Sequence, residues 1–188
     1  MLSRLEDTTR AVSPEPTGIS LSRRGMLFAP LLAAYPLAFS AIPAHASRIN
    51  PAETKVTLPN EIKWSGWLKG FPAESAEMAN LYGDPNGSGP YLVLMKWYPG
   101  FMSAPHSYAT DRICVVVSGT WWVNSGADFD PANTVPVSAE GFVLRVAHTP
   151  HYDGVRADAK EPAVIAIFGI APINLELVER GKPAWRRV

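Results

Sequence analysis

Residues 100–119 read GFMSAPHSYATDRICVVVSG, with turn residues and a histidine ahead of a continuous apolar run. The run at residues 112–117 is rich in β-branched side chains, which is typical of a strand. Because alternate side chains of a strand lie on the same face, we expect Arg112, Cys114 and Val116 to share one face. If that face is inward, Arg112 lies inside the fold.

Further strands are expected on both sides of this stretch. The candidate segments are residues 91–98, 120–123, 141–146 and 163–170. The chain has 18 prolines and 14 glycines spread between short apolar runs, which favours many strands joined by turns. Ser118 and Gly119 predict a tight hairpin turn, residues 126–137 predict a loop, and residues 73–82 predict one helical turn. The predicted fold class is all-β, a sandwich or a barrel.

The opening stretch resembles the first sequence motif of the cupin superfamily. Gly100, His106 and Gly119 match that motif at the right separations. Tyr108 stands where the motif has a second histidine, and Arg112 stands where it has a glutamate. The resemblance implies a double-stranded β-helix, or jelly-roll barrel, with a degenerate metal-binding motif.

A later segment, residues 141–151, looks like the second cupin motif. Gly141 begins it, and the pair Pro150-His151 ends it, although the proline and glycine usual between them are absent. Residues 111–122 also resemble a bacterial cupin subgroup of poorly defined function, in which a histidine usually replaces the tyrosine noted above. The resemblance covers most of the chain after residue 46.

The resemblance implies a metal site inside the barrel. By strand parity His106 and Tyr108 point the same way, and from an inward face they would meet Arg112 and His151. A complete cupin site uses three histidines and one glutamate, whereas this chain offers His106, His151 and Tyr108 as metal ligands, the last as a phenolate. Asp111 could join them only through a bulge. Divalent Fe, Mn, Ni or Zn would suit such donors, and a site without metal stays an alternative, because two imidazoles alone bind divalent ions weakly.

Arg112 and Tyr108 are the candidate catalytic residues. A guanidinium cannot bind a metal cation but suits a carboxylate, a phosphate or an enolate, so Arg112 is expected to orient an anionic group. The alternative is a structural role, in which Arg112 points outward or pairs with Asp111. Tyr108 would act as metal ligand or as general acid and base. His148 is expected at a rim or turn of the barrel.

Three further side chains have simpler expected roles. Trp121 and Trp122 are adjacent in a strand and should point to opposite faces, so that one packs in the barrel. Cys114, the only cysteine, is expected to be a buried and inert thiol.

The preferred function is a metal-dependent cupin enzyme that acts on a small oxygenated or carboxylated compound. Dioxygenase chemistry is the first expectation from the resemblance, followed by isomerase or lyase chemistry. The alternative is a non-catalytic cupin that binds or senses a small molecule, possessing no metal site. A homodimer formed through residues 60–71 is a third expectation.

The first part of the chain has the features of an export signal. Residues 1–46 contain Arg23-Arg24, an apolar stretch and the small-residue pattern at 44–46, so we expect a cleaved signal and a periplasmic or secreted protein. Residues 22–27 resemble a twin-arginine signal; a general secretory signal and a membrane anchor are the alternatives. We expect an arm at residues 47–71 and the barrel at residues 72–188. The 17 basic and 17 acidic side chains are scattered, which argues against a nucleic-acid partner.

Overall fold

The computed structural model describes residues 49–50, 52–66 and 70–188. The chain divides into two units, residues 1–54 and 55–188, and the strands belong to the second unit. The expected export signal at residues 1–46 lies outside the described residues. Among the residues that are described, no helix is both long and apolar enough to cross a membrane.

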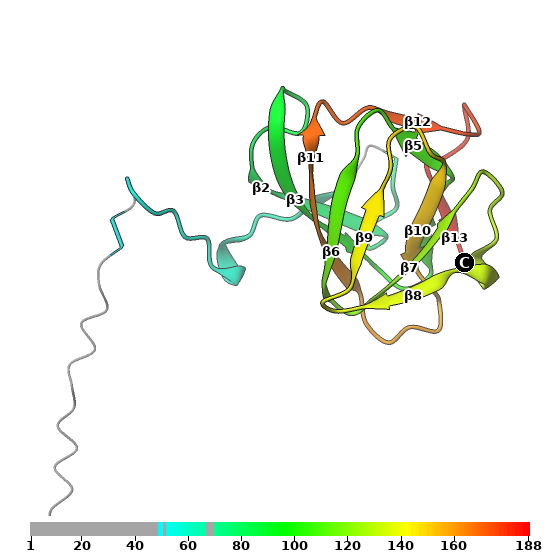
Figure 1. Cartoon of the computed structure of the whole chain (residues 1–188). Helices are drawn as coiled ribbons and strands as arrows, with labels where there is room; N and C mark the ends of the chain where they lie inside the picture. Colours follow the sequence, from blue (N-terminus) through cyan, green and yellow to red (C-terminus); the bar gives the residue numbers. More distant parts are fainter. Residues whose placement is uncertain (1–48, 51, 67–69) are drawn as a thin grey trace, which may run out of the picture. The chain divides into compact units, whose positions relative to one another are not determined.

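The second unit is built from two antiparallel sheets (Figure 1). The first sheet has the strand order β1 (Ser65–Gly66), β2 (Ala76–Tyr82), β3 (Gly89–Trp97), β11 (Ala163–Ala171), β6 (Arg112–Ser118), β9 (Phe142–Arg145). The second has the order β12 (Leu175–Leu177), β5 (His106–Tyr108), β10 (His151–Val155), β4 (Phe101–Ser103), β13 (Trp185–Arg187), with β7 (Thr120–Ser125) on β10 and β8 (Val135–Ser138) on β7. The two short 3-10 turns are Pro59–Glu61 and Pro131–Asn133.

The core lies between the two sheets, and buried positions alternate along β6 and β11. In β6, Arg112, Cys114 and Val116 are buried, whereas Ile113 and Val115 are exposed. This confirms the expected inward face of that strand. Buried side chains from both sheets form one cluster, so the all-β jelly-roll barrel is confirmed.

All five expected strands are present, as β3, β6, β7, β9 and β11. The helical turn expected at residues 73–82 is wrong, because most of that segment is strand β2. Helix propensity is weak compared with strand pairing: Glu77 lies opposite Lys96 of β3 and accepts a 2.8 Å hydrogen bond from its Nζ. The loop expected at residues 126–137 is wrong at its end, where β8 begins at Val135.

The hairpin turn expected at Ser118-Gly119 is also wrong. Strand β6 belongs to the first sheet and β7 to the second, so the chain crosses between the sheets at Gly119. Gly119 has a φ of 71°, and a Cβ atom there would lie 2.3 Å from the carbonyl oxygen of Pro162. The glycine therefore marks a tight corner of the barrel rather than a two-stranded turn.

Candidate functional site

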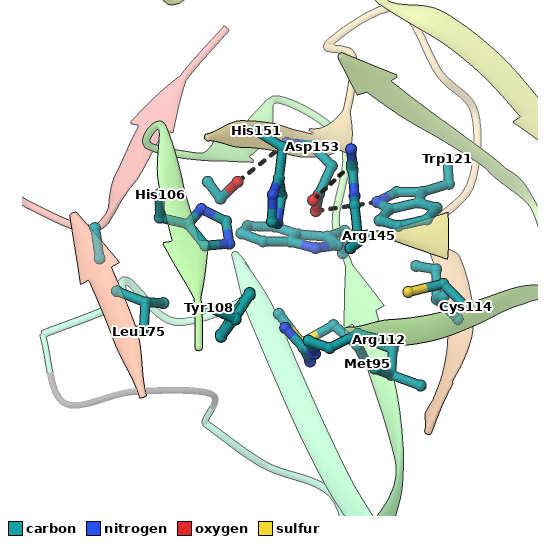
Figure 2. Close-up of a pocket in the computed structure, with 15 residues that line it drawn as sticks. Met95, His106, Tyr108, Arg112, Cys114, Trp121, Arg145, His151, Asp153 and Leu175 are labelled. Atoms are coloured by element: carbon teal, nitrogen blue, oxygen red, sulfur yellow. Dashed lines mark hydrogen bonds and ion pairs between the residues drawn. The ribbon is translucent and has the colours of Figure 1, made fainter. Parts of the chain in front are cut away.

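A cavity of about 30 Å³ lies inside the barrel (Figure 2). This is room for roughly two water molecules. Both sheets contribute to its wall, and the segment that includes β12 and leads to β13 closes it. The lining side chains are Met95, Trp97, Ser103, His106, Tyr108, Arg112, Cys114, Trp121, Arg145, His151, Asp153, Ile165, Ile167, Leu175 and Ala184.

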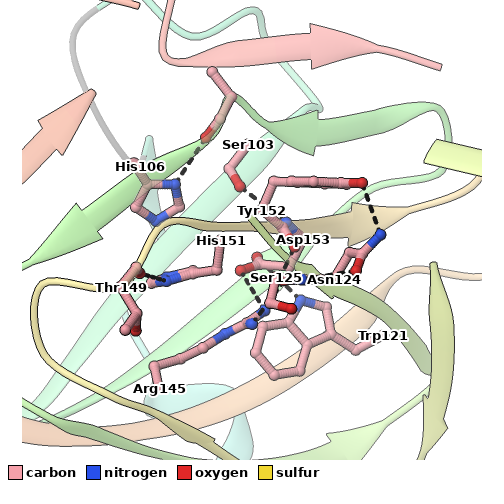
Figure 3. A network of polar contacts seen from close by, with 11 residues as sticks. Ser103, His106, Trp121, Asn124, Ser125, Arg145, Thr149, His151, Tyr152 and Asp153 are labelled. Atoms are coloured by element: carbon pink, nitrogen blue, oxygen red, sulfur yellow. Dashed lines mark hydrogen bonds and ion pairs between the residues drawn. The ribbon is translucent and has the colours of Figure 1, made fainter. Parts of the chain in front are cut away.

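Two histidines face each other across neighbouring strands of the second sheet. His106 of β5 and His151 of β10 are partners in the strand register, and their ring centroids are 4.5 Å apart. Each ring donates its Nδ1 hydrogen to a backbone carbonyl two residues earlier, at 2.8 Å to Ala104 and 2.9 Å to Thr149 (Figure 3). Since a carbonyl only accepts, each Nε2 keeps a lone pair that is free to accept a proton or bind an ion.

Burial keeps both imidazoles neutral. Loss of water lowers the pKa of His151 to about 3, assisted by the neighbouring His106 and by the positive charge of Arg145. Burial also lowers the pKa of His106, although the carboxylate of Asp153 opposes that shift. At neutral pH the site therefore contains two uncharged bases.

Tyr108 and Arg112 form the adjoining wall. The Tyr108 ring centroid lies 5.0 Å from that of His106, and the guanidinium carbon of Arg112 lies 3.9 Å from the Tyr108 ring centroid. Burial raises the pKa of the Tyr108 hydroxyl, and the charge of Arg112 offsets this only in part. Tyr108 is thus a neutral phenol that can donate a hydrogen bond.

Arg112 is a buried cation without a hydrogen-bond partner at two of its nitrogen atoms. The residue is 5% exposed, its buried Nε and Nη2 have no hydrogen-bond partner, and its polar neighbours are the phenols of Tyr91 and Tyr108. The alternative that Arg112 points outward or pairs with Asp111 is wrong. Asp111 is exposed and instead accepts a 2.7 Å hydrogen bond from the backbone nitrogen of Ala147.

The second arginine of the cavity, by contrast, is paired. Arg145 of β9 forms a buried ion pair with Asp153 of β10, with 3.1 Å between Nη2 and Oδ2. Asp153 also accepts a 3.1 Å hydrogen bond from the indole nitrogen of Trp121 (Figure 3). Asp153 is therefore committed to these two donors, and the charge of Arg112 stays uncompensated.

The sequence analysis missed Arg145 and Asp153. Arg145 lies in a strand with apolar side chains on both sides, and a strand of that kind is usually buried on both faces, so the arginine could have been placed inside. For Asp153 no such signal exists, because Asp and Gly are rare in strands and residues 151–155 did not read as one. The structure nevertheless buries all of β10.

The other candidates fall where the sequence placed them. His148 is exposed in a turn, with a φ of 57°. Trp121 is buried in the barrel and Trp122 is only half-buried. Cys114 is buried, and burial raises the pKa of its thiol to about 11, which makes it a poor nucleophile at neutral pH.

The donor set does not complete a metal site. Among the described residues there is no group of three or more His, Cys, Asp or Glu side chains placed to hold an ion. The cavity offers two imidazoles and a protonated phenol, and the guanidinium of Arg112 beside that phenol would repel a cation. Since a protein metal site commonly has three or four ligands, we derive no chemical step through a metal.

Comparisons with known proteins find likeness in structure only. The sequence matches no model of a protein family, and it matches no curated protein. The polyketide cyclase RemF from Streptomyces resistomycificus is similar over 69% of this chain and 88% of its own, with a TM-score of 0.56 and 13% identity.

Two further solved structures are similar at this level. An RmlC-like cupin protein from Ralstonia eutropha JMP134 matches 71% of this chain and 79% of its own, with a TM-score of 0.52 and 15% identity. A cupin-2 domain protein from Rhodospirillum rubrum matches 68% and 81%, with a TM-score of 0.51 and 16% identity. Together with the two antiparallel sheets, these likenesses identify the chain as a cupin-fold β-barrel.

Proposed function

We propose that this protein binds a small organic anion inside the barrel and moves a proton on it. The observation that carries the proposal is that the buried Arg112 cation has two nitrogen atoms without a hydrogen-bond partner and no carboxylate paired with it. A buried charge without a partner costs folding free energy, and a ligand carboxylate or enolate oxygen would relieve that cost through charge-assisted hydrogen bonds. The small cavity fits a ligand fragment of a few atoms at this place.

The charge balance of the cavity supports an anion over a neutral or cationic ligand. Arg145 and Asp153 neutralise each other, and both histidines are uncharged. This leaves one net positive charge, on Arg112. An anion with a single negative charge would balance the site.

The two imidazoles supply the chemistry. With Nδ1 bound to a carbonyl, the free Nε2 of His106 or His151 can accept a proton from a hydroxyl or from a carbon next to the carboxylate. Arg112 would stabilise the negative charge that develops, and the Tyr108 hydroxyl would donate to it. Isomerase or lyase chemistry needs only these elements. One of the structural neighbours is named a cyclase, but that likeness extends to the fold alone.

Anion-dependent stabilisation tests the binding. Acetate, pyruvate and benzoate are added in turn, and the free energy of unfolding is measured by urea denaturation. A ligand at 100 times its Kd should stabilise the protein by about 2.7 kcal/mol. Arg112→Met should abolish that gain, whereas Arg156→Met, which removes an exposed arginine paired with Asp158, should keep it. Equal gains in the two variants would contradict the proposal.

A non-catalytic binding protein would also hold the anion through Arg112, but its two histidines would transfer no proton. Proton exchange separates the two roles. In deuterated water, NMR should show the methyl protons of added pyruvate exchanging faster with the protein than without it. Replacing both histidines by asparagine should remove that acceleration. Anion binding without accelerated exchange for any probe would favour the sensing role.

A metal-dependent enzyme is the second candidate, and the orientation of the histidines favours it. Metal-binding histidines generally donate their other ring N–H to a carbonyl or carboxylate, as His106 and His151 do. If Tyr108 were deprotonated, it would hold Fe, Mn, Ni or Zn together with these two residues, and the metal would supply Lewis-acid or redox chemistry. Dioxygenase chemistry belongs to this candidate. Less than about one-tenth of an equivalent of metal in the purified protein, unchanged by His106→Ala or His151→Ala, would exclude it.

A further inference from the structure

The outer surface of the first sheet carries an uncovered apolar face. It is formed by β6, β9 and β11, which are neighbours in the sheet (Figure 1). Six outward side chains define the face, each between 39% and 61% exposed: Ile113, Val115, Phe142, Leu144, Phe168 and Ile170.

These side chains are contiguous across the strands. In the strand register Phe168 lies opposite Ile113, and Ile113 lies opposite Leu144. The next row pairs Val115 with Phe142. Because side chains on one face of neighbouring strands contact each other, the residues make one surface and not scattered exposed positions.

The composition of the face is unusual for a sheet exposed to water. An antiparallel sheet with one solvated face normally alternates apolar and polar residues. Here the outward positions of β6, β9 and β11 carry no charged side chain, and all three strands lie within the described residues. These strands therefore turn apolar side chains toward the solvent, whereas their inward positions include Arg112 and Arg145.

The opposite half of the same outer surface is already covered. Leu94 of β3 is 9% exposed and Ala79 of β2 is 1% exposed, although both point outward by register. Trp64, which precedes β1, packs over the Nζ atom of Lys96 at 3.9 Å from the ring centroid. A residue before β1 thus lies against the outer side of β3, next to the apolar face in the strand order.

We infer that the apolar face binds a second copy of this chain in a two-fold symmetric dimer. In such a dimer each patch meets itself, so any charge near the axis would face a like charge, and this face has none. Six large apolar side chains, each 39% to 61% exposed, supply much of the roughly 800 Å² that each partner of a standard interface buries. A contiguous apolar patch of this kind often marks an interaction surface. The dimer differs from the one expected through residues 60–71.

Light scattering coupled to size exclusion tests the inference on the full chain. The wild type should have twice the mass of the 20.4 kDa chain at micromolar concentration. Val115→Glu places two like charges in the interface and should raise the dimer dissociation constant at least ~100-fold, which gives a monomer. Val135→Glu is the matched control, because Val135 is 59% exposed on β8 of the other sheet, and it should leave the dimer intact.

Circular dichroism establishes that the variants fold. If the glutamate variant does not, Phe142→Thr with Leu144→Thr replaces it, since threonine keeps the preference for strands. A monomeric wild type would overturn the inference. So would a dimer that persists in the Val115→Glu variant. If that variant does not fold, a dimer that persists in the double threonine variant would overturn it. A wild-type monomer that floats with phosphatidylglycerol vesicles would assign the face to a lipid surface instead.

Discussion

At the scale of single residues, the cavity contains two buried arginines in opposite situations. Arg112 has no carboxylate partner, whereas Arg145 is paired with Asp153. Removal of an unpaired buried charge relieves a desolvation cost, whereas removal of one member of a buried pair exposes the other to that cost.

The two arginines should therefore respond oppositely to the same substitution. Arg112→Met is expected to raise the free energy of unfolding of the ligand-free protein by about 1 to 4 kcal/mol. Arg145→Met is expected to lower it by about 3 to 5 kcal/mol, because Asp153 loses its cation. Urea denaturation measures both values. A destabilising Arg112→Met would show that the guanidinium serves the fold and not a ligand.

The buried histidines predict how stability depends on pH. Their pKa values are lowered in the folded protein, so unfolding takes up protons below the unfolded pKa of about 6.5. Their full contribution to stability is present above that pH and is lost as the pH falls towards the folded pKa, about 3 for His151. Between pH 6 and 5 His151 should cost up to about 1.4 kcal/mol per pH unit, and the lowered pKa of His106 acts in the same direction.

Denaturation of chelator-treated protein at pH 6 and pH 5 checks this slope. His151→Asn should make the slope shallower, by up to about 1.4 kcal/mol per pH unit. His148→Asn is the control, since His148 is exposed and asparagine tolerates its positive φ. The explanation is wrong if both variants keep the wild-type slope.

The same residues show how much of the site could be predicted from the sequence. Strand parity and the motif resemblance predicted that His106, Tyr108, Arg112 and His151 would meet, and the structure brings them together. They did not predict that the buried acid, Asp153, pairs with Arg145, because Asp153 lies in β10, whose Asp and Gly disfavour a strand assignment. Partners distant in sequence are set by the register between strands, which local patterns do not contain.

At the scale of elements, the corner at Gly119 joins the two sheets. Ser-Gly between two strands is compatible with a hairpin and also with a corner at which the chain leaves one sheet for the other. The local pattern could not distinguish these cases, and a hairpin was predicted. The deciding contact is distant in sequence: the backbone at Pro162 lies against the glycine. A similar distant contact, with β3, turned the expected helix at residues 73–82 into strand β2.

A methyl group at this corner should be poorly tolerated. Gly119→Ala combines a positive φ with a clash at 2.3 Å, and it should cost at least ~2 kcal/mol more than Gly126→Ala. Gly126 also has a positive φ, of 105°, but a Cβ atom there has nothing within 4 Å. Urea denaturation of both variants gives the difference. Equal losses in the free energy of unfolding would mean that the positive φ alone, and not the contact with Pro162, requires a glycine at position 119.

At the scale of the whole molecule, the barrel shows hydrophobic surface that folding of one chain leaves uncovered. The apolar face explains why β6 and β11 read as continuous apolar runs: the core needs only alternate residues. Their outward residues would serve an interface. Strands were predicted from these runs, but an apolar outer surface was not.

If this surface holds a dimer, thermal stability should depend on protein concentration. Mass action stabilises a folded dimer relative to unfolded chains, so the Tm of the wild type should rise between 1 and 100 µM protein. Differential scanning calorimetry measures it. Val115→Glu should unfold at the same temperature at both concentrations. A wild-type Tm that does not move would contradict the dimer.

The hydrogen bonds that orient the two histidines affect which mutations the site can tolerate during evolution. Each imidazole is held by a carbonyl two residues earlier in its own chain segment, at Ala104 and Thr149. Neither ring relies on the other, on Tyr108 or on a ligand for its direction. A single exchange at position 108 can therefore add or remove a donor without disorienting the remaining pair of imidazoles.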